Sequence, residues 1–154
     1  MRKETAFIIG FLIFTMTTAA LIWWVALPNF KPVVLPEVAS GTIEVGPMRR
    51  NHVLDAEDIH TLNDWLKAHK SGWGPVSRTP PSSGDARFVL KDANGVDVLA
   101  ITLWTGISAA DWNDTVFVES PDGTQVHMQN FSTKEFAPLR MIVDGFPFRH
   151  SAFP

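Results

Sequence analysis

The sequence predicts an α+β protein: one N-terminal transmembrane helix, then a small domain with an antiparallel four- to five-stranded sheet and two helices. Three observations lead to this class. The stretch from Thr5 to Leu27 carries no charged residue, and it is long enough as an α-helix to cross a hydrocarbon core of about 30 Å. An apolar stripe with helical period follows near residue 60, and two hairpin patterns of period two lie between residues 86 and 129.

These patterns divide the chain into four parts. We expect a cytoplasmic tail at 1–4, a transmembrane helix at 5–27, a Pro-rich stalk or strap at 28–41, and an extracytoplasmic α+β domain with a Phe-rich C-terminal tail at 42–154.

The flanking charges set the expected orientation of the helix. Arg2 and Lys3 precede the apolar run, which favours a cytoplasmic N-terminus, although Lys31 lies close to the other end. A cleaved signal peptide is the alternative, but its apolar part is typically about 7–15 residues long. Here the run is longer and ends in Trp23 and Trp24, aromatic residues typical of the membrane interface. We therefore expect an uncleaved anchor in a bacterial inner membrane, with the domain in the periplasm.

The chain contains no cysteine. A lipoprotein anchor, structural disulfides and Cys-ligated zinc or iron–sulfur centres are therefore excluded. Of the 13 basic and 16 acidic residues, all but Arg2, Lys3 and Glu4 lie beyond Leu27. The domain is thus mildly acidic, and nucleic acid is not an expected partner.

Residues 28–41 contain three prolines and little helical pattern. Proline favours extended backbone, so this segment forms either a stiff stalk, about 40 Å long if fully extended, or a strap lying on a partner. Val33, Val34 and Leu35 are apolar for a solvated linker, which indicates contact with another surface.

The first soluble elements are a short strand at 42–45, an ambiguous segment at 48–54 and a helix at 56–70. Asp55 is a suitable N-cap and Gly72 a suitable residue after the helix end. The following segment, 71–85, is rich in Gly, Pro and Ser and is expected to be a loop. Trp73 within it either folds back onto the sheet as a lid or is presented to a partner.

Two hairpins and a helix complete the domain. Strands at 86–91 and 96–105 flank an Asn-Gly turn, and the second is apolar on both faces, so it should be central. A helical turn at 108–112 precedes a second hairpin at 115–119 and 124–129, in which the face carrying Gln125, His127 and Gln129 is expected to be wet or at an edge. A capping box at Ser132 opens a helix to about 143, with a kink or a late start at Pro138.

No catalytic, cofactor or metal pattern is present in the sequence. The five histidines form no HxxxH, HxH or HExxH pair, and no GxSxG, Walker or GxGxxG loop occurs. We therefore expect no catalytic residue, no cofactor-binding residue, no metal ligand and no enzymatic activity.

The favoured function is a non-catalytic, single-pass accessory or assembly subunit of a larger membrane complex of respiratory, photosynthetic or secretion type. Its partners would be other integral membrane subunits and the lipid bilayer, contacted through exposed aromatic and apolar side chains. The candidate partner-binding residues are Trp23, Trp24, Val33, Val34, Leu35, Trp73, Phe146, Phe148 and Phe153. The alternative is a membrane-tethered periplasmic binding module for a peptide, glycan or protein ligand.

Overall fold

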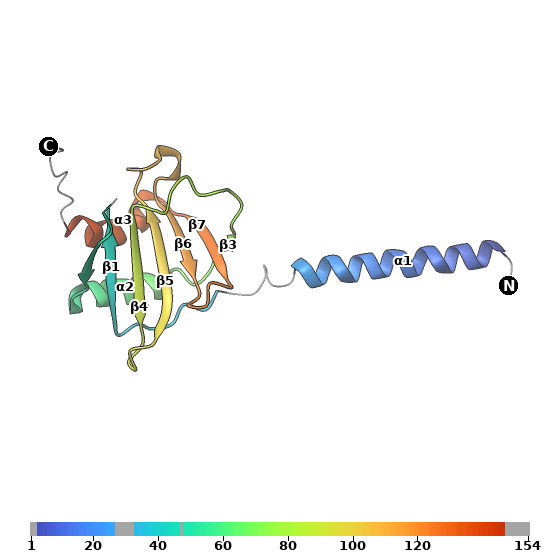
Figure 1. Ribbon diagram of the computed structural model, residues 1–154, viewed down its shortest axis with the longest axis horizontal. Coiled ribbons are helices and arrows are strands. Elements are labelled where there is room, and N and C mark those ends of the chain that lie inside the picture. Colours follow the sequence, from blue (N-terminus) through green and yellow to red (C-terminus); the bar gives the residue numbers. More distant parts are fainter. Residues whose placement is uncertain (1–2, 27–32, 47, 147–154) are drawn as a thin grey trace. The chain divides into compact units, whose positions relative to one another are not determined.

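The computed structural model describes residues 3–26, 33–46 and 48–146. They form two compact units, residues 1–32 and 33–154. The first unit contains α1, Lys3–Ala26 (Figure 1). Three threonine hydroxyls of α1 donate to carbonyls of the preceding turn at 2.8–3.0 Å: those of Thr15, Thr17 and Thr18. The polar groups within this apolar helix are thus satisfied by its own backbone.

The segment Lys3–Val25 has a mean hydropathy of 2.1 and is long and apolar enough to cross a membrane. Length and composition alone fit a membrane anchor and a signal sequence equally well. α1 begins two residues before the predicted apolar run, at Lys3.

The second unit contains a seven-stranded antiparallel sheet with the order β2-β1-β4-β5-β6-β7-β3 (Figure 1). The mixed α+β class is confirmed, but the predicted number of strands, four to five, is wrong. The strands are β1 Ser40–Val45, β2 Arg50–Val53, β3 Gly74–Pro75, β4 Ala86–Lys91, β5 Asp97–Trp104, β6 Thr115–Glu119 and β7 Val126–Asn130.

The additional strands are the two edges of the sheet. β2 lies in the segment that the sequence left ambiguous, and three of its four side chains are exposed, so it has no alternating apolar pattern. β3 consists of two residues within the predicted loop, and it pairs with Met128 and His127 of β7. Both edges are defined by their neighbours rather than by their own sequences, so the period-two signal cannot reveal them.

The two hairpins form where they were predicted. β4 pairs with β5 and β6 pairs with β7. β5 is the middle strand of the sheet, and its side chains from Leu99 to Trp104 are all buried. The expectation that this strand is central is therefore confirmed.

Both predicted helices are present with adjusted ends. α2, Ala56–Ala68, has Asp55 in a capping box, but it ends two residues early because His69 leaves the helical conformation (φ −118°, ψ 47°). Gly72 is therefore not the residue after the helix end. α3, Thr133–Asp144, begins after Ser132 and runs through Pro138, so the expected late start is wrong. Burial of Leu139, Ile142 and Val143 holds the helix together across the proline, which removes only one hydrogen bond.

α2 and α3 lie on the same face of the sheet and bury the main core against it (Figure 1). That core includes Ile43, Leu62, Phe88, Ile101 and Phe136, none of them exposed. The opposite face carries a smaller cluster of Trp104, Phe117 and Met128 with Trp112 of the short 3-10 helix η2, Ala110–Trp112. Central strand β5 is therefore covered on both faces, although only one face is covered by helices.

Candidate functional site

A cavity of about 340 Å³ opens at the end of the sheet where β5 and β7 begin and β6 ends. Its volume falls within the range of about 300–1,000 Å³ that is usual for small-molecule sites. We call it the strap cavity because residues 33–36 form one wall. The lining is Val33, Val34, Pro36, Asp97, Val98, Leu99, Val118, Glu119, Ser120, Pro121, Gln125 and His127.

The wall belongs to a segment that lies on its own domain, residues 33–39, which we call the strap. Val33 and Leu35 pack against the core, and Val38 is buried within it. Asn63 of α2 clamps the backbone of Val38, accepting from its N–H at 2.9 Å and donating to its carbonyl at 2.8 Å. The N–H of Ala39 donates to the carbonyl of Lys91. The described part of the predicted stalk or strap therefore contacts the domain.

His127 contributes the buried polar group of the cavity. It lies on β7 directly opposite Val118, so its side chain shares the helix-covered face of the sheet. Only 5% of its surface is exposed, so the expectation of a wet face or an edge is wrong at His127, whereas Gln125 on the same face is exposed and Gln129 is half-buried. The sheet extends beyond β7 to β3, and this neighbouring strand shields the His127 backbone.

Two buried side-chain atoms of β7 have no hydrogen-bond partner among the described residues: His127 Nδ1 and Gln129 Oε1. The two residues are separated by one position and so lie on the same face of the strand. An unsatisfied buried polar group costs about 1–3 kcal/mol, so such groups in native proteins call for an explanation. Of the two residues, only His127 lines the strap cavity, and its Nδ1 is not exposed to it, so these atoms do not by themselves indicate a ligand.

Charged side chains at the rim of the strap cavity are already paired. Glu119 accepts from Arg87 at 2.8 Å, and Asp97 lies 3.5 Å from Lys91. Acidic residues line the cavity, whereas its described lining contains no Lys or Arg. Because both carboxylates are paired, the described charges at the rim compensate one another and do not select a charged ligand group.

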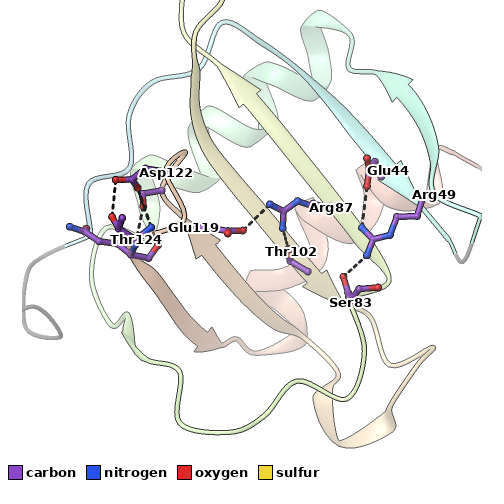
Figure 2. A network of polar contacts seen from close by, with 10 residues as sticks. Glu44, Arg49, Ser83, Arg87, Thr102, Glu119, Asp122 and Thr124 are labelled. Atoms are coloured by element: carbon purple, nitrogen blue, oxygen red, sulfur yellow. Dashed lines mark hydrogen bonds and ion pairs between the residues drawn. The ribbon is translucent and has the colours of Figure 1, made fainter.

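The Arg87–Glu119 pair belongs to the face of the sheet that the helices leave uncovered (Figure 2). Arg87 also donates to Thr102 at 3.2 Å. Its side chain crosses β5 beside Ala100, whose small side chain leaves room for the guanidinium to reach β6. This network ties three strands together and holds the Glu119 carboxylate on the uncovered face of the sheet, opposite to the face that carries His127.

A second, more open groove of about 690 Å³ lies between α2 and α3. Its floor is Trp65, whose indole N–H donates to the Glu135 carbonyl at 2.8 Å. The remaining lining is Thr61, Asp64, Ala68, His69, Ser132, Lys134, Glu135 and Pro138. The donor at its base is already satisfied, so this groove presents less unused hydrogen-bonding capacity than the strap cavity.

The predicted partner-binding residues are not gathered on one surface. Trp73 lies half-buried against the core, in edge contact with Trp65 and Phe131, and its indole donates to the His69 carbonyl at 2.7 Å. Of the two alternatives for Trp73, folding back onto the domain agrees with this arrangement. Phe146 is half-buried and stacks on His52 at 4.7 Å.

The other predicted residues divide between exposed positions and positions packed on the domain. Val33 and Leu35 pack against the core, whereas Val34 is 79% exposed. Trp23 and Trp24 of α1 are 63% and 78% exposed. Phe148 and Phe153 lie outside the described residues. Binding of a partner by these side chains stays a prediction.

The described residues include no group of three or more His, Asp or Glu side chains that could hold a metal ion. Carboxyl groups with shifted pKa lie at caps and turns, and none of them is a lining residue of the strap cavity. Desolvation raises the pKa of Asp58 in the α2 cap, and the Ser132 hydroxyl lowers the pKa of Glu135 in the α3 cap. Backbone and side-chain hydrogen bonds lower the pKa of Asp92 and Asp122 in the hairpin turns. These shifts reflect local structure rather than proton-transfer chemistry.

No family model matches the chain, and no curated protein is significantly similar to it. Among solved structures, the fold is similar to a crystal structure from Clostridium perfringens that is provisionally described as a lipoprotein. The TM-score is 0.50 at 13% sequence identity, over 69% of this chain and 84% of that one. At this identity the likeness shows the fold alone.

Sequence reasoning missed the strap cavity and His127. The available signal was the alternation of Val126, His127, Met128 and Gln129, which places polar side chains on one face of a strand. Pairing across the β6–β7 hairpin decides that this face is the buried one, and pairing register cannot be read from strand composition.

Proposed function

We propose that this chain is a non-catalytic, membrane-tethered binding module whose ligand occupies the strap cavity. The single observation that supports this proposal most strongly is the strap cavity itself, about 340 Å³ in volume and lined mainly by aliphatic side chains, with the polar side chains of Gln125 and His127 among them. Polar groups of this kind usually orient a ligand within an otherwise apolar site. The absence of a recognisable catalytic motif supports a binding role over an enzymatic one.

In this proposal α1 is retained as a single-pass anchor in a bacterial inner membrane. The Arg2 and Lys3 charges hold the N-terminus in the cytoplasm, and the domain lies in the periplasm. The fold neighbour is described as a lipoprotein, a class that is held at membranes by a lipid on cysteine. This chain has no cysteine, so α1 would supply the attachment instead.

The test is a fragment screen on the full chain in lipid nanodiscs, read as the thermal unfolding midpoint. A molecule that binds only the folded state raises this midpoint in a concentration-dependent way. The matched control is Val98→Trp, which fills the cavity without changing His127. We expect some fragments to stabilise the wild type and not the filled variant. Failure of every fragment, or equal stabilisation of both proteins, would overturn the proposal.

The second candidate is the accessory subunit of a larger membrane complex, with integral membrane subunits as partners. The observation that favours it is the exposure of Trp23, Trp24 and Val34, three large apolar or aromatic side chains. Affinity purification of the full chain in mild detergent, followed by mass spectrometry, tests this function. Stoichiometric membrane proteins would support it, and a pure, lone protein would count against it.

A further inference from the structure

The strap is held unevenly along its length. Its described hydrogen bonds all lie at its C-terminal end, where Asn63 binds both backbone groups of Val38. The N–H of the next residue donates to the carbonyl of Lys91 at 2.8 Å, and β1 then begins at Ser40 and pairs with β4. From Val38 onward, the chain is therefore fixed to the folded domain by its backbone.

The first part of the strap, residues 33–37, is held by side chains alone. Val33 and Leu35 pack half-buried against the core. Glu37 lies 3.6 Å from Lys67, but both side chains are mostly exposed, and exposed ion pairs add little to stability. Among the described residues, no hydrogen bond ties the backbone of this part to the domain.

Opening of residues 33–37 is therefore less costly than unfolding of the domain. Two half-buried side chains are all that offsets the conformational entropy lost when the segment is ordered. Segments with few buried contacts and few backbone hydrogen bonds open locally, with free energies below that of global unfolding. Pro36 fixes its own backbone and restricts Leu35 to extended conformations, so the segment stays extended when it leaves the domain.

The same segment forms the movable side of the strap cavity. Val33, Val34 and Pro36 line the cavity, and all three precede the fixed point at Val38. The other lining residues belong to β5, β6, β7 and the turn between β6 and β7, at positions 97–99, 118–121, 125 and 127. A molecule in the cavity thus lies between a wall that can move and a sheet that cannot.

We propose that residues 33–37 are a hinged wall of the strap cavity, which opens about Val38 while the rest of the domain stays folded. Molecules enter and leave the cavity by this movement, and a bound molecule holds the wall closed because it contacts the wall. The role of the movement in binding rests on the proposed function, whereas the opening itself does not.

The absence of cysteine permits single reporter thiols along the strap. Val33→Cys reports on the moving wall, and Val38→Cys, at a position that is 3% exposed, reports on the fixed side of the hinge. Val34→Cys, at a position that is 79% exposed, gives the rate of an unprotected thiol. Cysteine behaves as a small apolar residue, so these replacements should preserve the fold. Each full chain, in lipid nanodiscs, is reacted with iodoacetamide at urea concentrations below the unfolding transition.

We expect the thiol at position 33 to react about 10–100 times more slowly than the thiol at position 34, and the thiol at position 38 about 1,000 times more slowly or less. Urea should accelerate labelling only slightly at position 33, because local opening exposes little surface, and steeply at position 38, where labelling requires global unfolding. Asn63→Ala should accelerate labelling at position 38 and lower its urea dependence, because the hinge then lies closer to β1.

Two outcomes would overturn the hinged wall. Equal rates and equal urea dependence at positions 33 and 38 would show that the strap opens only when the whole domain unfolds. Equal rates at positions 33 and 34 would show that packing against the core does not hold the wall closed.

The link between the wall and binding is tested with a fragment selected by the thermal screen. The fragment should slow labelling at position 33, and it should fail to do so when the chain also carries Val98→Trp, which fills the cavity. An unchanged rate at position 33 would refute the coupling and leave the binding function in place. If no fragment binds, the proposed function fails, and the labelling rates still decide whether the wall opens.

Discussion

His127→Leu is predicted to stabilise the folded domain. The imidazole is 5% exposed and its Nδ1 has no partner among the described residues. Removal of such a group recovers its desolvation cost of about 1–3 kcal/mol. Leucine has a similar size and adds apolar surface to the core beside Val118. We expect a gain of about 1–2 kcal/mol in the free energy of unfolding.

The assay is urea unfolding of the full chain in nanodiscs, followed by tryptophan fluorescence. With a slope of about 2 kcal/mol per molar urea, the expected gain moves the midpoint upward by about 0.5–1 M. The control is His60→Leu: the His60 side chain is 77% exposed, so its replacement should change stability by less than about 0.5 kcal/mol.

A decrease of about 1 kcal/mol or more in the free energy of unfolding of His127→Leu would refute the reasoning. It would mean that the imidazole makes hydrogen bonds within the folded chain that outweigh its desolvation. A gain in stability combined with a loss of ligand binding would be the usual signature of a side chain retained for function.

Three further predictions concern the strap, the glycines and pH. Asn63→Ala removes both hydrogen bonds to the strap and should lower the free energy of unfolding by about 1–3 kcal/mol. Proteolysis within residues 33–39 should become faster. An unchanged rate of cleavage would show that Asn63 does not hold the strap. Gly84→Ala should cost about 2–4 kcal/mol, because φ is +87° and the new Cβ would clash with the Thr102 side chain. Gly95 also has a positive φ, +77°, but has open space around it, so Gly95→Ala should cost about 1 kcal/mol in the same urea assay. Equal losses of stability in the two glycine variants would argue against the close approach of Thr102 to Gly84. Hydrogen bonds with Ser132 lower the pKa of Glu135 in the folded state, so the ionised carboxylate stabilises the fold at pH values above its ordinary pKa of about 4.3. This stabilisation is lost as the pH falls through the lower pKa of the folded state. Glu135→Gln should therefore melt at a lower temperature than the wild type near neutral pH, and this difference should vanish on acidification. A difference that persists at pH 3 would contradict the predicted direction of the pH dependence.

Local signals predicted the elements that carry their own patterns. The N-cap at Asp55, the capping box at Ser132 and the hairpin turn that ends at Gly95 are short-range features, and each lies where the sequence indicated. β5 was recognised as central because it is apolar on both faces, which is a property of its own residues.

Features that depend on distant partners were missed. β3 exists because β7 offers free backbone groups to Gly74, and α3 continues through Pro138 because its apolar side chains are buried. His127 is buried because the hairpin register places it opposite Val118. The candidate site is built from such pairings together with the strap, so neither residue types nor spacing along the chain could identify it.

The most direct test of the central claim is the ¹⁵N chemical shift of the His127 ring nitrogens in the full chain, with and without a fragment selected by the thermal screen. The chain has five histidines, so selective ¹⁵N-histidine labelling gives a small set of signals. We predict that the bound fragment moves the ring signals of His127, which lines the strap cavity, and leaves those of exposed His60 unchanged. His127 signals that do not move at a saturating concentration of the fragment would contradict the account.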